Sequence, residues 1–133
     1  MTATITDLNP QKIVNPPELA SHFVAVNDLP WSSTEFPGIE MKVLYLDRSS
    51  GASTIMFRMQ PGAVVPAHEH TALEQTFILS GSLKDDEGEA CAGEYVWRPG
   101  GNRHIAHAPN GAVFLSFFLK PNKFDQGTRF FTE

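Results

Sequence analysis

The chain has 133 residues, of which 41% are hydrophobic and 19% charged, and this composition is typical of one globular domain rather than a disordered chain. Its formal net charge is −5, and lysines and arginines form no cluster, which argues against nucleic-acid binding. A single cysteine, Cys91, excludes an intramolecular disulfide and a zinc site built from cysteines.

The first segment, residues 1–20, contains three prolines and little periodicity, so we expect an N-terminal arm. The barrel domain is then expected to cover residues 21–133, with a C-terminal extension. The opening residues lack the basic and apolar regions of a secretory signal. No apolar stretch approaches the roughly 20 residues that cross a bilayer. We therefore expect no membrane partner and a cytoplasmic location.

After the arm, short runs rich in β-branched and aromatic residues alternate with turns rich in Gly, Pro, Asn and Asp. No run keeps a helical apolar period for ten residues. The pattern predicts one all-β domain, a sandwich or barrel. The runs expected to form strands are SHFVAV (21–26), IEMKVLYLD (39–47), ASTIMFRMQ (52–60), LEQTFILSGSLKD (73–85), EYVWRP (94–99) and AVFLSFFLK (112–120).

Several residues in and between these runs are given an expected environment from their residue type. Cys91 is expected to be a small buried hydrophobe. Arg58 and Arg98 are expected at the surface, although one of them could line the cavity and bind an anionic substrate. The residues expected in the core or in a cavity wall are Tyr45, Met56, Phe57, Met59, Thr76, Ile78, Trp97, Phe114 and Phe117.

A pair of histidines suggests a metal site. Residues i and i+2 of a strand share a face, so His68 and His70 project together, with Glu69 on the opposite face. Glu74 opens the next strand, and if it faces inward it adds a carboxylate. The chain returns after a Pro-Gly-Gly turn, where His104 can supply a third imidazole. Such ligands suit iron(II), zinc, nickel or manganese better than calcium or magnesium.

The same residues have a purely structural interpretation. Buried histidines often only donate to backbone carbonyls, and an isolated Glu74 would be an ordinary surface carboxylate. His107 lies three residues beyond His104, which places it on the other face of a strand, and we expect it not to be a ligand. His22 is expected to lie outside the site.

Over residues 36–120 the sequence resembles the cupin superfamily. Its two motifs, G-x5-HxH-x3-E-x6-G and G-x5-P-x-G-x2-H, are matched at Gly62, His68, His70, Glu74, Gly81, Gly93, Pro99, Gly101 and His104. The resemblance implies a double-stranded β-helix, the jelly-roll barrel, with a metal held by His68, His70, Glu74 and His104. Ala108 replaces the usual Asn of the second motif, which removes an expected hydrogen bond. The short segment 82–92 implies a tight hairpin at residues 84–88.

Within this superfamily the chain resembles the cupin domain of ChrR-type anti-sigma factors. It is also similar to dioxygenases that cleave acetylacetone and dihydroxyacetophenone and hold iron(II) through the matching histidines. Residues 1–35 are too few for the zinc-binding domain that precedes the ChrR cupin, and they contain only His22, so sigma-factor binding is not carried over.

The leading hypothesis is an enzyme, an iron(II) dioxygenase that cleaves a carbon–carbon bond of a small β-diketone or hydroxyketone, with Glu74 as a catalytic residue. The alternatives are a non-catalytic sensor that binds a metal and a small ligand, and a metal-dependent sugar isomerase or lyase, for which the strands offer few polar residues. The resemblance also implies a homodimer that exchanges N-terminal segments, with residues 1–20 as the candidate arm.

Overall fold

The computed structural model of the chain describes residue 4 and residues 11–125. The rest of the arm and of the C-terminal extension lies outside these described residues. The described part has two short 3-10 helices, η2 (Pro17–Leu19) and η3 (Val26–Asp28). Its strands are β1 (Ser32–Ser33), β2 (Ile39–Leu46), β3 (Ser53–Met59), β4 (Val64–Glu69), β5 (Glu74–Lys84), β6 (Glu89–Cys91), β7 (Tyr95–Arg98), β8 (Arg103–His107), β9 (Ala112–Phe118) and β10 (Lys123–Phe124).

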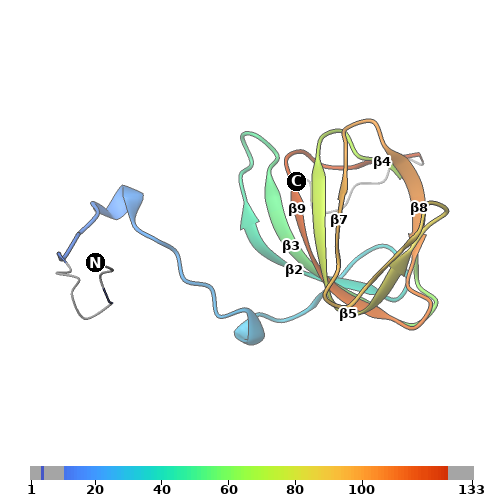
Figure 1. The fold of residues 1–133 in the computed structure, drawn as a ribbon. Helices are drawn as coiled ribbons and strands as arrows, with labels where there is room; N and C mark the ends of the chain where they lie inside the picture. The colour runs from blue at the N-terminus through green and yellow to red at the C-terminus, as the bar shows by residue number, and fades with distance from the viewer. Residues whose placement is uncertain (1–3, 5–10, 126–133) are drawn as a thin grey trace.

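These strands form two sheets that curl into a barrel (Figure 1). The first sheet has the order β1-β2-β3-β9-β5-β7, and all its pairs are antiparallel. The second joins β10, β4 and β8, and β8 meets the far end of β5, which also pairs with β6. Because β5 is 11 residues long, it belongs to both sheets and connects them. The predicted all-β barrel is confirmed. Among the described residues, no helix is both long and apolar enough to cross a membrane.

Five of the six predicted runs form strands, and the prediction for the first run is wrong. Residues 21–26 form no strand; the segment is exposed and leads into η3. Phe23 is 95% exposed. A strand is stabilised by hydrogen bonds to a neighbour, and this segment has no neighbouring strand in the described chain, so its β propensity alone does not suffice.

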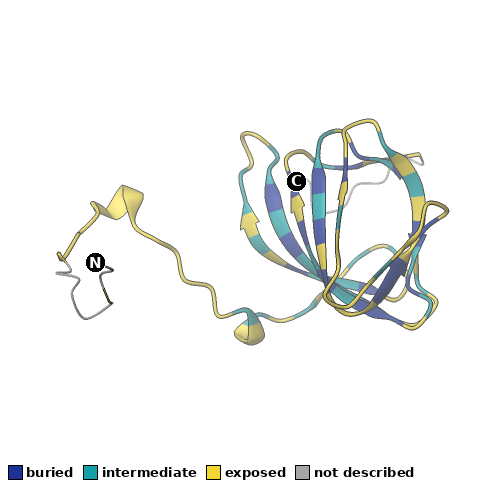
Figure 2. Cartoon of the chain, viewed as in Figure 1, coloured by how far each residue is buried: buried dark blue, intermediate teal, exposed yellow. Residues whose placement is uncertain are grey.

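The core lies between the inner faces of the sheets. Phe57, Met59, Thr76, Ile78 and Phe114 are buried as predicted. The rings of Phe57 and Phe114 stack across the β3–β9 pair with centroids 5.3 Å apart. Along β3 and β9 buried residues alternate with more exposed ones, as Figure 2 shows by its alternating colours.

The other core predictions are corrected. Tyr45, Trp97 and Phe117 are exposed by 58%, 59% and 42%, and Met56 is only half-buried. All four lie on the outer face of the first sheet. Apolar residues occupy both faces of these strands, so composition does not reveal which face points inward.

Gly81 marks the point where β5 passes from one sheet to the other. Its φ is +70°, a left-handed conformation that favours glycine. A Cβ at this position would overlap the carbonyl oxygen of Gly111, which accepts a hydrogen bond from the backbone N–H of Ser82. The close approach of two backbones therefore requires glycine here.

We predict that Gly81→Ala destabilises the barrel more than Gly62→Ala. Gly62 has a similar φ of +83°, but a Cβ there would meet no atom within 4 Å. The Gly62 variant should lose about 1–2 kcal/mol of unfolding free energy from backbone strain. The Gly81 variant should lose about 1–3 kcal/mol more from overlap. Urea unfolding followed by circular dichroism measures both, and equal losses would contradict the prediction.

Candidate metal centre

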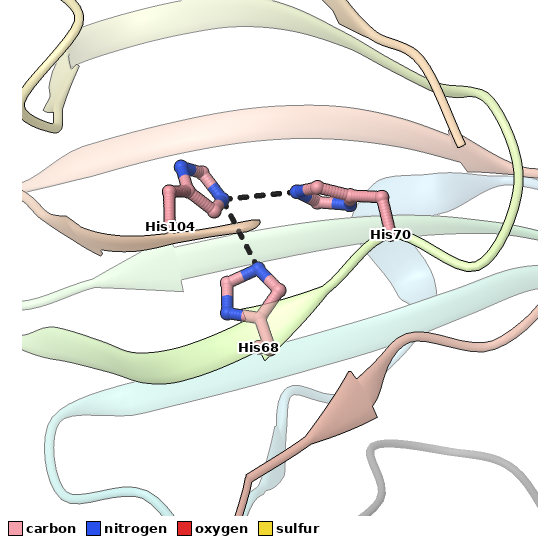
Figure 3. A group of neighbouring side chains, drawn as sticks. All are labelled: His68, His70 and His104. Atoms are coloured by element: carbon pink, nitrogen blue, oxygen red, sulfur yellow. Dashed lines mark hydrogen bonds between the residues drawn. The ribbon is translucent and has the colours of Figure 1, made fainter. Parts of the chain in front are cut away.

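The antiparallel pairing of β4 with β8 brings the three histidines together. His68 and His104 are direct register partners in this pair. His70 follows the end of β4, and its backbone N–H donates to the carbonyl of Asn102, 2.8 Å away. The Nε2 atom of His104 lies 3.0 Å from Nε2 of His68 and 3.0 Å from Nε2 of His70 (Figure 3). Each ring thus points its Nε2 atom toward a common centre, and the three ligand atoms lie within 4.8 Å of one another.

On the opposite side, the Nδ1 atom of each ring faces an acceptor. His68 Nδ1 lies 2.7 Å from the carbonyl oxygen of Pro66, and His104 Nδ1 lies 2.7 Å from Oδ2 of Asp85. His70 Nδ1 lies 2.8 Å from Oε2 of Glu74. A neutral imidazole in this setting keeps its proton on Nδ1 and leaves a lone pair on Nε2. Three lone pairs so close together repel one another unless a cation lies between them, so the donor set fits a metal ion.

Burial keeps two of these rings in the form that binds metal. It lowers the pKa of His68 to about 4, against the opposing effect of the hydrogen bond to Pro66. Burial also lowers the pKa of His104, although the bond to Asp85 acts the other way. Both imidazoles are therefore neutral at neutral pH, with Nε2 available as a ligand.

Glu74 opens β5 and faces inward on the same face as Thr76 and Ile78, as the strand pattern predicts. Thr76 donates to its Oε1 at 3.1 Å. Burial alone would raise the pKa of Glu74, but the hydrogen bond from His70 and the electrostatic interaction with its ring, with smaller contributions from His68 and Asn122, hold it below its usual value. The carboxylate is thus ionised and contacts the Nδ1 side of His70, outside the group of three Nε2 atoms. Its role as a ligand stays a prediction.

Two supporting residues were missed by the sequence analysis. Asp85 lies in the predicted tight hairpin, where its N–H donates to the carbonyl of Gly88 at 3.0 Å, and its side chain reaches His104. The Oδ1 atom of Asn122 accepts a hydrogen bond from His70 Nδ1 at 3.1 Å. Asn122 therefore supplies an amide contact that Ala108, the fully buried residue in place of the usual Asn, cannot make. Both contacts join residues that are far apart in the sequence, so no local sequence pattern predicts them.

Arg98 also differs from its expected surface position. It is buried at the end of β7, and one guanidinium nitrogen lies 3.2 Å from Oδ2 of Asp85. Burial would raise the pKa of Asp85, but the hydrogen bond from His104, the N–H groups of the hairpin and the charge of Arg98 together lower it. A carboxylate held between a guanidinium and an imidazole fixes the orientation of the His104 ring.

The remaining candidate residues lie away from the group. His107 is half-buried at the end of β8, and His22 is exposed on the arm. Arg58 is paired with Glu40 on the outer face, at 2.7 Å. Cys91 is exposed at the end of the short strand β6, so its expected burial is wrong.

A small cavity of about 30 Å³ adjoins the histidines. This volume holds about two water molecules. Seven of its twelve lining residues are apolar, and the five polar ones include His68, Glu74 and His104. The lining residues are Ile39, Phe57, Val65, His68, Glu74, Leu83, His104, Ala106, Phe114, Ser116, Phe118 and Asn122.

This barrel, with His68 on β4, His70 directly after it, His104 on β8 and the glutamate on β5, defines a cupin. More narrowly, residues 19–123 match the ChrR cupin-like domain, and the chain belongs to that family. A search of curated proteins finds no match.

Solved structures have the same fold. An acetylacetone dioxygenase from Acinetobacter johnsonii is similar with a TM-score of 0.74 and 23% identity, over 90% of this chain and 89% of that one. The complex of Rhodobacter sphaeroides SigE with the anti-sigma ChrR gives 0.62 and 22%, over 70% of this chain and 51% of that one. The polyketide cyclase RemF from Streptomyces resistomycificus gives 0.61 and 21%, over 74% and 78%. Enzymes and a regulator thus share this barrel.

We predict that Asp85→Asn destabilises the metal-free protein by about 3 kcal/mol, because it leaves the buried charge of Arg98 without its partner. The double variant Asp85→Asn/Arg98→Met should recover part of this loss. As a control, Glu40→Gln breaks the partly exposed pair with Arg58 and should cost about 0–1 kcal/mol. Urea unfolding in the presence of a chelator measures all three, and additive losses in the double variant would contradict the coupling.

Proposed function

We propose that His68, His70 and His104 hold one divalent transition metal ion. The observation that carries this proposal is the convergence of three Nε2 atoms while each Nδ1 is occupied by an acceptor. At metal–nitrogen distances of about 2.1 Å, ligands at neighbouring positions lie about 3 Å apart, which agrees with the two separations of 3.0 Å. Iron(II) is the metal we propose, and zinc, nickel and manganese suit the same donors.

We further propose that the protein is a dioxygenase that cleaves a carbon–carbon bond of a small β-diketone or hydroxyketone. Bound iron(II) would supply Lewis-acid and redox chemistry. Three protein nitrogens leave coordination positions for other groups, and the similarity to an acetylacetone dioxygenase supports the choice of substrate class. Phe57, Phe114 and Phe118 would exclude water from the apolar part of the cavity.

Glu74 is the residue we assign to proton transfer. Its carboxylate is ionised, lines the cavity and lies beside His70. We propose that it accepts the proton that a β-diketone loses from the carbon between its carbonyls, while Thr76 holds the other carboxylate oxygen. The cavity of about 30 Å³ is smaller than such a substrate, so side chains around it must move when the substrate binds.

That small cavity also favours a second candidate, a non-catalytic module that binds a metal and signals through a partner. The similarity of this chain to the ChrR complex supports this alternative. A sugar isomerase or lyase is disfavoured, because seven of the twelve residues that line the cavity are apolar. The cytoplasmic location stays a prediction.

We predict that the protein purified without a nickel column carries about one metal ion per chain, and that His104→Ala removes it. His107→Ala is the matched control on the same strand, and it should keep the metal because this ring lies outside the group. Elemental analysis of both variants after dialysis provides the measurement. Retention of metal by the His104 variant, or its loss from the His107 variant alone, would refute the ligand assignment.

Oxygen uptake with acetylacetone tests the proposed chemistry. We expect consumption by the iron(II)-loaded protein and none by the zinc-loaded protein. Glu74→Gln should abolish uptake but keep the iron if Glu74 transfers a proton, whereas loss of iron would make Glu74 a ligand. If metal raises the melting temperature while no diketone in a panel supports uptake, the sensor module is the better description.

A further inference from the structure

The outer edge of β7 is unpaired in the part of the chain that the structure describes. β7 pairs with β5 alone, and β9 occupies the other side of β5 (Figure 1). Just beyond β7, Ile78 of β5 donates to the carbonyl of Glu94 at 3.0 Å and accepts from the N–H of Gly93 at 2.8 Å. Ile78 therefore directs both of its backbone polar groups toward the side of β7.

This contact determines which backbone groups of β7 face outward. In an antiparallel pair, every second residue directs its N–H and C=O groups to the same neighbour. Counted in twos from Ile78, the residues of β7 that bond to β5 are Val96 and Arg98. The N–H and C=O groups of Tyr95 and Trp97 point the other way, and these two residues are 52% and 59% exposed. An exposed edge of this kind can pair with another extended chain.

A cleft of about 390 Å³ lies beside this edge. Its volume is within the roughly 300–1,000 Å³ of ligand-binding clefts. β7 forms one wall and the β5–β6 hairpin forms the other. The cleft shares only Leu83 with the cavity at the histidines, so it is a separate site.

The cleft is acidic. Four carboxylates line it, and the guanidinium of Arg98 is the one basic group among them. Arg98 and the buried Asp85 compensate each other, 3.2 Å apart. The other three carboxylates are exposed, and the hydrogen bonds they accept come from uncharged donors; these residues are Glu87, Glu89 and Glu94. Three uncompensated negative charges beside the free edge attract a positively charged ligand.

We propose that an extended basic segment of a partner protein binds in this cleft as an additional strand on β7. Its backbone pairs with Tyr95 and Trp97. Its side chains alternate between two sides, because successive residues of a strand point in opposite directions. Lysines or arginines on one side reach the three glutamates, and apolar residues on the other side pack beside the rings of Tyr95 and Trp97. This inference does not depend on the metal chemistry proposed above.

Other occupants fit this edge less well. A second copy of this chain has a net charge of −5, and no two of its lysines and arginines are two positions apart, so it lacks the alternating basic pattern. A small organic cation would satisfy the glutamates but would leave the backbone groups of β7 unpaired. An extended basic segment satisfies both, and about six residues span the four of β7 with one to spare at each end.

Titration calorimetry at low salt with the peptide acetyl-Lys-Val-Lys-Val-Lys-Val-amide tests the charge requirement. The wild type should bind it, and the peptide with Glu in place of Lys should not bind. The variant Glu87→Gln/Glu89→Gln/Glu94→Gln should raise the dissociation constant by about 10-fold or more, because three ion pairs are lost. The matched control changes the net charge equally at exposed positions outside the cleft, and should bind like the wild type; it is Glu18→Gln/Asp28→Asn/Glu35→Gln.

N-methylated peptides test the strand pairing itself. Methylation of every valine nitrogen removes the N–H donors along one edge of the extended peptide, and methylation of every lysine nitrogen removes those along the other. Exactly one of these two peptides should lose binding. Loss with the valine set indicates an antiparallel added strand, and loss with the lysine set indicates a parallel one.

Several outcomes would overturn the proposal. Equal affinities of the two methylated peptides would show that no strand is added. Binding of spermine as tight as that of the Lys-Val peptide would make the cleft a site for small cations. Absence of peptide binding to the wild type, or an unchanged dissociation constant in the glutamate variant, would also contradict it. Circular dichroism verifies that both variants are folded.

Discussion

The pairing of β4 with β8 is the contact on which the candidate site depends. It makes His68 and His104 direct partners, and the two backbone hydrogen bonds between His70 and the turn before β8 bring in the third ring. Neither strand contributes enough donors alone. The pairing therefore gathers the three Nε2 atoms, and the acceptors behind the rings determine which nitrogen faces the centre.

Those acceptors come from separate parts of the barrel. The carbonyl of Pro66 belongs to β4 itself, Glu74 to the start of β5, and Asp85 to the hairpin after β5. Arg98 then ties that hairpin to β7. The orientation of the rings is thus maintained by both sheets, so the geometry of the site reports on the integrity of the whole barrel rather than of one strand.

The sequence predicted what depends on local spacing. Strand parity placed His68 and His70 on one face and Glu74 on the face of Thr76, because both follow from a period of two. It did not find Asp85 and Asn122 as partners of the histidines, since those contacts join residues 19 and 52 positions apart. It also missed Arg98 as the partner of Asp85, because that contact links β7 to the hairpin after β5. Nor could it place Trp97 outside, because both faces of the first sheet are apolar.

The 11 residues of β5 serve two surfaces at once. Glu74, Thr76 and Ile78 line the interior, while Phe77 and Leu79 are exposed on the outer side of the sheet. Almost every side chain in the first half of the strand therefore belongs to one of these two surfaces. Insertion or deletion of one residue there would exchange the two sets, placing phenylalanine at the histidines and a carboxylate outside. In evolutionary terms, this strand can change by substitution of matched residues but hardly in length.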